Sequence, residues 1–413
     1  MFKCFLSLIL SLSMIFTTVN AKSLEDTKIY GESYVVIDGE TNEVILGKNI
    51  DEKMYPASVS KLITAILLAE NFSPTDTLVF TSKAKSMPEY SVNLNYYPLE
   101  VGQELSADFI MKSILIFSAN DMAQTAADNI SEKLGVSFET LMNNKLKELG
   151  LTNTYFTNGI GLHDDNHYST AYDLAILLKG ALKYDWIREV VGIKETTVTL
   201  PDGSLIIYEN SNKLLGTLGM IGGKTGYTSK AGRTLVGAFE IDGKLYFASV
   251  LKSVYDSEDT FVFQDMYNIV DIAKDKEKTL LYKNGQQLES KVLFEYNLFG
   301  FFGPKKVVEV PVILKEDVYI YDDPYNLENM TMKVQLKDDI NIFTNGNKLV
   351  GILSINIKGH ESSYDIGVNI SKIIAKNLHI YLLALVLIIF IIVFIIILII
   401  KLSRPKKSKR IWG

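Results

Sequence analysis

The chain has 413 residues, of which 47% are hydrophobic and 22% charged, and its formal net charge is -6. This length and composition allow two domains with hydrophobic cores, and the acidic balance gives no support to nucleic-acid binding. The single cysteine, Cys4, lies in a predicted leader. The mature chain would therefore offer no disulfide, thiolate metal site or thiol nucleophile.

The N-terminal segment has the pattern of a secretory leader. Lys3 precedes an apolar run at 5–16, and Val19-Asn20-Ala21 follows it. We predict a signal peptide at 1–21, cleaved after Ala21. Residues 33–38 and 43–46 are rich in β-branched side chains and are joined by a turn-like segment, so they predict a β-hairpin.

A serine and a lysine mark the start of the first predicted helix. Pro56-Ala57-Ser58-Val59-Ser60-Lys61 opens an apolar run at 62–69. Proline suits the first turn of a helix, and residues three apart share a helix face, so the Lys61 amine should lie beside the Ser58 hydroxyl. A hydroxyl needs such a base to act as a nucleophile. Because the same spacing recurs at Ser82/Lys85, the pattern alone is weak evidence.

Two further motifs strengthen this interpretation. Ser118-Ala119-Asn120 follows a helix-like apolar stretch at 109–117, and Lys224-Thr225-Gly226 precedes a strand-like run at 234–239. A second Ser-x-Asn occurs at Ser91-Val92-Asn93. We favour Ser118 over Ser91 because of the helical pattern that surrounds it.

The remaining pattern indicates two domains and an anchor. Helices are predicted within 107–150 and at 170–182 and 258–274, and hairpins at 196–208 and 234–251. Short alternating runs follow, at 307–312, 318–321, 332–336, 340–343 and 349–357. We predict a catalytic domain at 22–276, a β-rich domain at 277–372, a transmembrane helix at 379–400 and a basic cytoplasmic tail at 401–413. This topology places residues 22–378 on the outer, extracytoplasmic side of the cell membrane.

Ser-x-x-Lys, Ser-x-Asn and Lys-Thr-Gly, in this order, are the signature of penicillin-binding proteins and serine β-lactamases. Over roughly residues 23–275, the chain resembles the low-molecular-weight D-alanyl-D-alanine carboxypeptidases. The segments that carry this resemblance, besides the three motifs, are 34–38, 55–58, 166–171 and 223–228. The resemblance implies an α+β fold of the transpeptidase/β-lactamase type, with an antiparallel sheet beside a helical subdomain and a small all-β domain after it. Such enzymes remove the terminal D-alanine from peptidoglycan stem pentapeptides and are acylated by β-lactam antibiotics. No cofactor is expected.

The resemblance also assigns roles to residues. Ser58 would be the nucleophile, Lys61 its base and Ser118 a proton relay. The Ser58 and Tyr227 backbone N–H groups would hold the oxyanion. The substrate-binding residues would be Asn120, Lys224, Thr225, Gly226 and Tyr227.

Other possibilities remain open from the sequence. A β-lactamase shares the acylation machinery, and a β-lactam sensor would be acylated without turnover. His163, Asp164, Asp165 and His167 could form a metal cluster, but their segment resembles a structural loop of the carboxypeptidases, so no metal is expected. Arg233 could assist carboxylate binding or be an ordinary exposed arginine.

Overall fold

The computed structural model describes residues 24, 27–337 and 350–403. The predicted signal peptide, the run at 340–343 and residues 404–413 of the predicted tail lie outside the described residues. The chain divides into two units. The first ends at Glu277 and also includes Tyr321–Leu327, and the second comprises Lys278–Ile320 and the chain from Glu328 onward.

An antiparallel sheet forms the centre of the first unit, with strand order β2-β1-β9-β8-β7. Its strands are β1 Ser33–Asp38, β2 Val44–Lys48, β7 Met220–Thr228, β8 Gly232–Ile241 and β9 Lys244–Ser253. Asp242-Gly243 makes the predicted turn between β8 and β9, with both residues at positive φ. The predicted mixed fold with an antiparallel sheet is confirmed.

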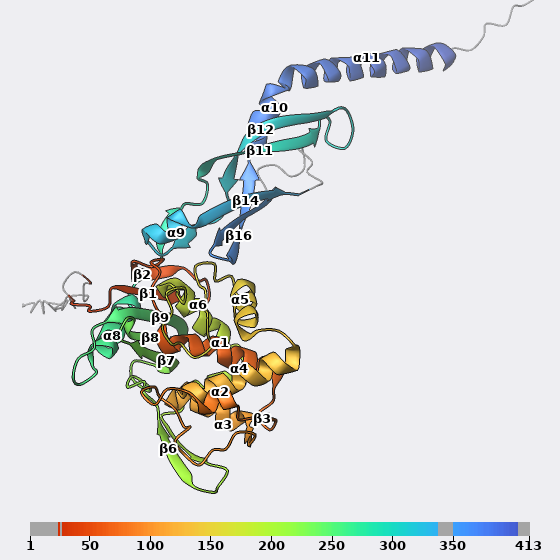
Figure 1. Cartoon of the computed structure of the whole chain (residues 1–413). Coiled ribbons are helices and arrows are strands. Elements are labelled where there is room, and N and C mark those ends of the chain that lie inside the picture. Colours follow the sequence, from red (N-terminus) through yellow and green to blue (C-terminus); the bar gives the residue numbers. More distant parts are fainter. Residues whose placement is uncertain (1–23, 25–26, 338–349, 404–413) are drawn as a thin grey trace, which may run out of the picture. The chain divides into compact units, whose positions relative to one another are not determined.

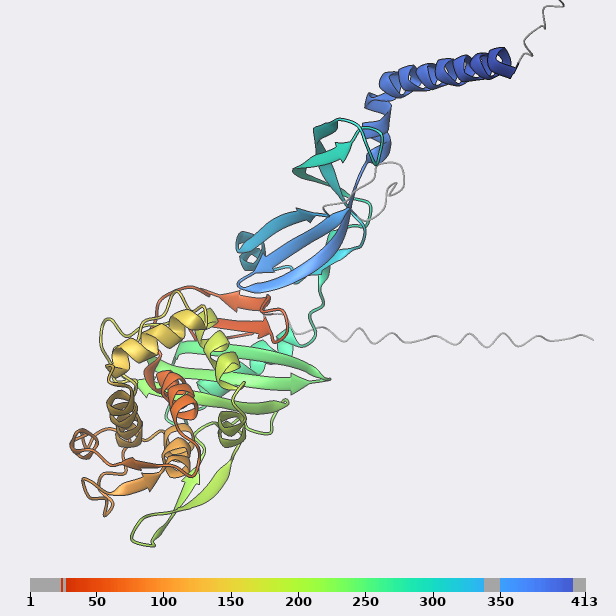
Figure 2. The same cartoon turned by 90° about the vertical axis from the view of Figure 1, so that its right-hand side faces the viewer.

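Both faces of this sheet are buried. Because successive strand side chains point to opposite faces, Val35 and Ile37 of β1 enter one core, whereas Tyr34 and Val36 enter another. Helix α8 (Phe261–Ala273) covers the second face (Figures 1 and 2). The first face carries the other helices and small hairpins of the unit. These are η1 Ala57–Ser60, α1 Lys61–Asn71, β3 Thr77–Val79, α2 Ser82–Lys85, β4 Glu104–Ser106, α3 Ala107–Lys112, η2 Ser113–Phe117, α4 Asn120–Leu134, α5 Phe138–Glu148, α6 Ala171–Ala181, α7 Asp185–Val191, β5 Glu195–Thr199 and β6 Leu205–Glu209.

A short late segment completes the edge of this sheet. Asn326, in α9 (Pro324–Glu328), is fully buried. Its Oδ1 accepts a hydrogen bond from Val44 N at 2.8 Å, and its Nδ2 donates to Val44 O at 2.8 Å. Since β2 is an edge strand, the side chain satisfies backbone groups that a neighbouring strand would otherwise pair. The sequence did not predict this return of the chain.

The second unit is rich in strands. It contains a five-stranded sheet in the order β11-β12-β16-β15-β14 and a separate pair, β10 with β13. The elements are β10 Thr279–Tyr282, β11 Gln287–Asn297, β12 Lys305–Leu314, β13 Val318–Ile320, β14 Met330–Leu336, β15 Gly351–Ile357, β16 His360–Val368, α10 Ile370–Lys376 and α11 Leu378–Ser403. Ile370 and Ile373 of α10 belong to a hydrophobic core together with Phe294 and Val368.

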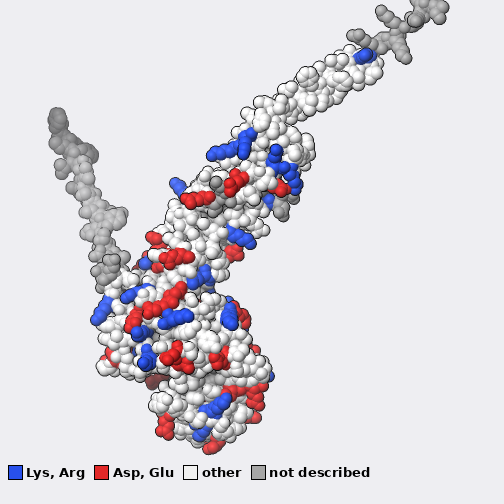
Figure 3. All heavy atoms as spheres, turned by 45° about the horizontal axis from the view of Figure 1, so that its top comes forward, with Lys and Arg blue, Asp and Glu red and all other residues white. Residues whose placement is uncertain are grey.

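Helix α11 is long and apolar enough to cross a membrane. Its 26 residues would extend about 39 Å at 1.5 Å per residue. No side chain of α11 is buried, and Figure 3 shows the helix as almost wholly uncharged apart from its far end, where Lys401 lies. An exposed surface of this kind is stable in lipid but not in water.

Candidate active site

Ser58 and Lys61 meet as predicted, but through a tighter turn than an α-helix. Ser58 lies in the 3₁₀ turn η1, and Lys61 is the first residue of α1. In a 3₁₀ turn, residues three apart are nearly eclipsed. The Lys61 Nζ consequently lies 2.8 Å from Ser58 Oγ.

Lys61 is fully buried. Its Nζ also contacts Asn120 Oδ1 at 2.6 Å and the Ile160 carbonyl oxygen at 2.5 Å. Burial lowers the pKa of this amine well below its ordinary value; the charge of Lys224 lowers it further, whereas Asp121 raises it. A neutral amine has two N–H donors for these two acceptors and one lone pair for the Ser58 hydroxyl. The contacts therefore suit a base directed at Ser58.

Ser60, the other serine beside Lys61, is used differently. Its side chain is fully buried, and its Oγ donates to the Ala57 carbonyl at 2.9 Å. Ser58 instead lines the cleft described below. Of these two hydroxyls, only the one at Ser58 is open to a substrate.

The second predicted serine lies at an irregular helix junction. Ser118 ends the π-helical turn η2 with left-handed backbone angles, φ 69° and ψ 29°. Such a conformation is costly for a residue with a side chain and is frequent at functional sites. Ser118 Oγ accepts a hydrogen bond from Lys224 Nζ at 2.9 Å. Two residues on, Asn120 begins α4 and turns its amide oxygen toward Lys61.

Lys-Thr-Gly lies within strand β7 itself, at the free edge of the sheet. Lys224 is buried and also donates to the Thr225 carbonyl at 3.0 Å. Burial, followed by the charge of Arg233, lowers the pKa of Lys224 to about 7. The Thr225 Oγ1 lies 2.5 Å from Ser211 Oγ, a contact that the sequence did not predict.

Two glycines permit the backbone to close around the nucleophile. A Cβ atom at Gly226 would lie 2.9 Å from Pro56 O and 3.0 Å from Ser58 N. At Gly161, where φ is +82°, a Cβ atom would lie 2.8 Å from Ser58 N. The direction in which a side chain of Gly226 would point is thus already filled by the turn that carries Ser58.

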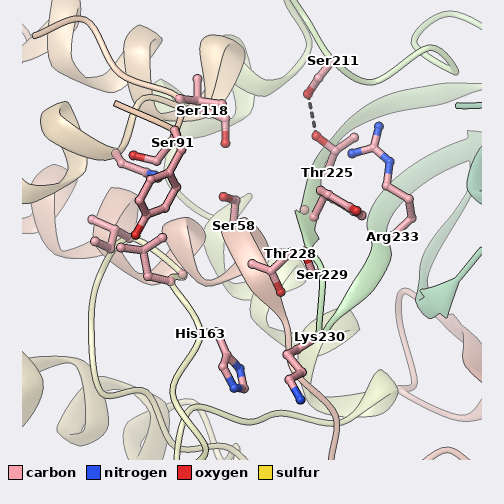
Figure 4. Close-up of a pocket in the computed structure, with 18 of the residues that line it drawn as sticks. Ser58, Ser91, Ser118, His163, Ser211, Thr225, Thr228, Ser229, Lys230 and Arg233 are labelled. Atoms are coloured by element: carbon pink, nitrogen blue, oxygen red, sulfur yellow. Dashed lines mark hydrogen bonds between the residues drawn. The ribbon is translucent and has the colours of Figure 1, made fainter. Parts of the chain in front are cut away.

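These residues line one cleft of about 690 Å³ (Figure 4). Ser58 lies between Ser118 on one side and Thr225 on the other. The lining residues are Ser58, Tyr90, Ser91, Val92, Phe117, Ser118, Asn120, Ile160, Gly161, Leu162, His163, Ser211, Thr225, Gly226, Tyr227, Thr228, Ser229, Lys230, Arg233 and Tyr255. Lys61 and Lys224 lie buried beneath this lining, where they contact Ser58 and Ser118 respectively.

The competing Ser-x-Asn motif also reaches the cleft, but it is occupied within its own loop. Ser91 Oγ donates to Pro88 O at 2.8 Å and accepts from Asn93 Nδ2 at 2.9 Å. Ser118, in contrast, contacts a buried lysine of another element. The geometry favours Ser118 for proton transfer.

Arg233 is not an ordinary exposed arginine, and its guanidinium already has a carboxylate partner within the protein. Its side chain is 13% exposed, and its guanidinium pairs with Asp259 through two nitrogens, with Nε 2.5 Å from Oδ1. It also lies over the rings of Tyr227 and Tyr255, 5.8 and 5.6 Å from their centroids. Arg233 therefore supports the rim of the cleft and adds positive potential near Lys224.

The histidine-rich loop has a structural arrangement. His167 is buried, stacks on Phe156, and accepts the Thr157 N–H at 3.2 Å through Nδ1. Burial lowers the pKa of this imidazole to about 4. Among the residues that the structure describes, no group of three His, Cys, Asp or Glu side chains is placed to hold a metal ion.

The fold and these contacts define a penicillin-binding type of serine acyltransferase site. A cefotaxime-bound crystal structure of penicillin-binding protein D2 from Listeria monocytogenes is 28% identical, with a TM-score of 0.53 over 60% of this chain and 99% of that one. The carboxypeptidase DacD from Francisella tularensis, 21% identical, shares the fold with a TM-score of 0.58 over 84% of this chain and 95% of its own.

Sequence comparison gives the family. Residues 18–254 match the peptidase S11 family, D-alanyl-D-alanine carboxypeptidase, and the chain belongs to this family. Relatives include DacF from Bacillus subtilis, 34% identical over 217 residues, and DacC from Escherichia coli, 31% identical over 238 residues. The matched regions cover 52% and 56% of this chain, and 56% and 58% of these relatives. The chain thus spans little more than half the length of these relatives.

Proposed function

We propose that this protein is a serine-type D-Ala-D-Ala carboxypeptidase that removes the terminal D-alanine from peptidoglycan stem pentapeptides. One observation carries the proposal: the 2.8 Å contact between Lys61 Nζ and Ser58 Oγ, in a cleft that Ser118 also lines, with Lys224 bonded to Ser118 from beneath. Membership of the S11 family supports the same activity.

Acylation follows from these positions. Ser58 Oγ attacks the carbonyl carbon of the penultimate D-alanine and gives its proton to Lys61. The backbone N–H groups of Ser58 and Tyr227 stabilise the oxyanion. The C–N bond then breaks, and the proton passes through Ser118 to the leaving amine.

Other residues hold the substrate during this step. Lys224 and Thr225, the latter braced by Ser211, bind the terminal carboxylate of the leaving D-alanine, and Asn120 orients the peptide amide. Water then attacks the ester carbon, which releases the shortened peptide and restores the Ser58 hydroxyl. A β-lactam acylates Ser58 through the same attack, in which the amide bond of its ring opens instead.

The surrounding chain suits an enzyme that works outside the cell. We assign residues 1–21 to a signal peptide, and 22–276 together with the return segment Tyr321–Leu327 to the catalytic domain. The rest of 277–372 is a β-rich spacer. Residues 379–400 are a membrane anchor, and a basic cytoplasmic tail follows them. The exposed apolar surface of α11 supports the anchor.

The test is release of D-alanine from diacetyl-L-Lys-D-Ala-D-Ala, measured beside hydrolysis of benzylpenicillin. We expect steady release of D-alanine and a long-lived penicilloyl adduct. Rapid penicillin turnover without release of D-alanine would instead indicate a β-lactamase. An adduct with no turnover of either compound would indicate a sensor.

A further inference from the structure

The cleft carries a charged residue for which the proposed reaction has no use. Lys230 lies in the turn between β7 and β8, is exposed, and lines the cleft. Among the described residues it makes no hydrogen bond or ion pair, unlike Lys61 and Lys224. We propose that Lys230 binds a carboxylate on the side chain of the third stem residue and so selects stems of the diaminopimelate type; this inference rests on the proposed function.

The direction of the cleft places Lys230 on the acyl side of the substrate. Ser211 and Thr225 lie at one end, where the terminal carboxylate is bound, and Ser58 lies in the middle. Beyond Ser58, toward the opposite end, are Thr228, Ser229 and Lys230, with His163 facing them (Figure 4). Residues that precede the scissile bond must therefore extend toward Lys230.

The distances along an extended peptide agree with this placement. A substrate lying along the free edge of β7 advances about 3.3 Å per residue. The third stem residue is two steps from the terminal D-alanine, which puts its backbone about 7 Å from the carboxylate site. Lys230 is five residues beyond Thr225, at most about 16 Å at the same rise. The remaining distance of about 9 Å is spanned by a long side chain that ends in a carboxylate together with the side chain of Lys230.

The charge of the cleft favours an anion at this end. Within the described residues, no Asp or Glu lines the cleft, whereas Lys230, His163 and Arg233 do. The guanidinium of Arg233 already has Asp259 as its ion-pair partner. Lys230 is thus the lining residue with an uncommitted positive charge. The distal end of meso-diaminopimelate carries an ammonium beside this carboxylate. Its amide and a lysine at the third stem position both present the ammonium alone and would meet like charge at Lys230.

The experiment compares pentapeptides of sequence L-Ala-γ-D-Glu-X-D-Ala-D-Ala, where X is meso-diaminopimelate, its ε-amide or L-lysine. A fourth peptide carries D-isoglutamine before diaminopimelate, since the second residue also has a carboxylate. For the wild-type enzyme, we expect kcat/KM to be about fivefold higher for the free acid than for the amide, as an exposed ion pair allows. The isoglutamine peptide should be cleaved like its parent.

Three variants test whether Lys230 causes the preference for the free acid over the amide. In Lys230→Ala the ratio of acid to amide should fall to about one, and in Lys230→Glu the L-lysine peptide should become the better substrate. Lys244→Ala, which removes an exposed lysine outside the cleft lining, should keep the wild-type ratio. Raising the salt concentration should reduce the wild-type ratio only.

Two results would overturn the inference. One is a wild-type ratio near one, and the other is an undiminished ratio in Lys230→Ala. If kcat/KM of the wild-type enzyme is lower for the isoglutamine peptide than for its parent, and this difference disappears in Lys230→Ala, then Lys230 contacts the second stem residue instead. Failure of the proposed function is separate, because the wild-type enzyme would then release no D-alanine from diacetyl-L-Lys-D-Ala-D-Ala or from any pentapeptide.

Discussion

Val44 and Asn326 are 282 residues apart in the chain, yet they exchange two hydrogen bonds of 2.8 Å. The Asn326 side chain takes the place of a backbone neighbour at the edge strand of the catalytic sheet. Tyr321, five residues earlier, is buried in the core beside α8. The catalytic unit therefore contains a piece of chain from beyond its apparent C-terminal boundary.

Replacing Asn326 by alanine should destabilise this unit. The buried Val44 N–H and C=O would lose their partner, which costs about 2 kcal/mol. Trp186 fluorescence during urea unfolding measures the effect in a chain that ends after Asn377, because the second tryptophan, Trp412, is then absent. The exposed Asn284→Ala serves as the matched control. Equal unfolding midpoints for the two variants would contradict the structural role of Asn326.

The acyl group should form on Ser58. Digestion of penicillin-labelled protein and mass spectrometry should locate the adduct there, and Ser58→Ala should not be labelled. Ser60→Ala should still be labelled, because the Ser60 hydroxyl is turned to the Ala57 carbonyl. Lys61→Ala should fold but acylate more slowly by orders of magnitude, as a nucleophile does without its base. An adduct on Ser60 would refute the mechanism.

Activity should show a bell-shaped dependence on pH. The Lys61 amine must be neutral, so kcat/KM falls as acid protonates it. Lys224 must be charged to hold the substrate carboxylate, and with a pKa of about 7 it loses its charge as the pH rises, so kcat/KM also falls on the alkaline side.

Two substitutions at Lys224 test its part in this profile. Lys224→Arg keeps a positive charge at all these pH values, so the fall of kcat/KM on the alkaline side should shift to higher pH. Lys224→Ala should lower kcat/KM roughly a hundredfold, since an unpaired carboxylate in the cleft costs about 3 kcal/mol. An alkaline limb that is unchanged in Lys224→Arg would assign that limb to another group.

His167 should make the fold sensitive to acid. Its pKa is about 4 in the folded protein, against 6.5 for an unperturbed histidine. The unfolded chain therefore binds more protons between these values, and stability is lost as the pH falls from 6.5 toward 4. The loss amounts to about 3 kcal/mol. Urea unfolding at pH 7.5 and 4.5 should show a smaller difference for His167→Gln, whose amide oxygen can still accept the Thr157 N–H; an equal difference would assign the effect to other groups.

The boundary of the soluble region should lie after α10. A chain that ends after Asn377 lacks α11 and should be soluble and active, since the cleft is formed before residue 256. A chain that ends at residue 369 loses Ile370 and Ile373, which are buried, and should unfold its C-terminal unit more easily. Thermal unfolding followed by circular dichroism distinguishes the two. Loss of activity in the longer, folded chain would show that α11 contributes to the site.

The sequence predicted those parts of the site that depend on local spacing. Ser58 and Lys61 are three residues apart, so any helical turn brings them together. The strong turn at Asp242-Gly243 likewise allowed the hairpin of β8 and β9 to be placed. The Lys-Thr-Gly segment is followed by a strand-like run, but its own glycines concealed that it forms strand β7.

The remaining contacts depend on tertiary packing. Nothing near Ser211 predicts that its hydroxyl meets Thr225, and the pairing of Arg233 with Asp259 joins a strand to a loop. The same holds for the left-handed Ser118, whose conformation follows from the π-helical turn before it. Such contacts carry no periodic signal and become visible only in the folded chain.

The return of Tyr321–Leu327 to the catalytic unit changes what a single cut of the backbone can release. A protease that cleaves between residues 278 and 320 divides the chain covalently, but the C-terminal fragment keeps Asn326 seated on β2 and Tyr321 buried in the core. The enzyme would leave such a cut as two fragments held by noncovalent contacts. A cut between residues 328 and 368 has the same limit, because β12 stays paired with β16 across it. Shedding of the catalytic unit from a membrane therefore requires either a cut after β16 or the withdrawal of a paired segment from its sheet.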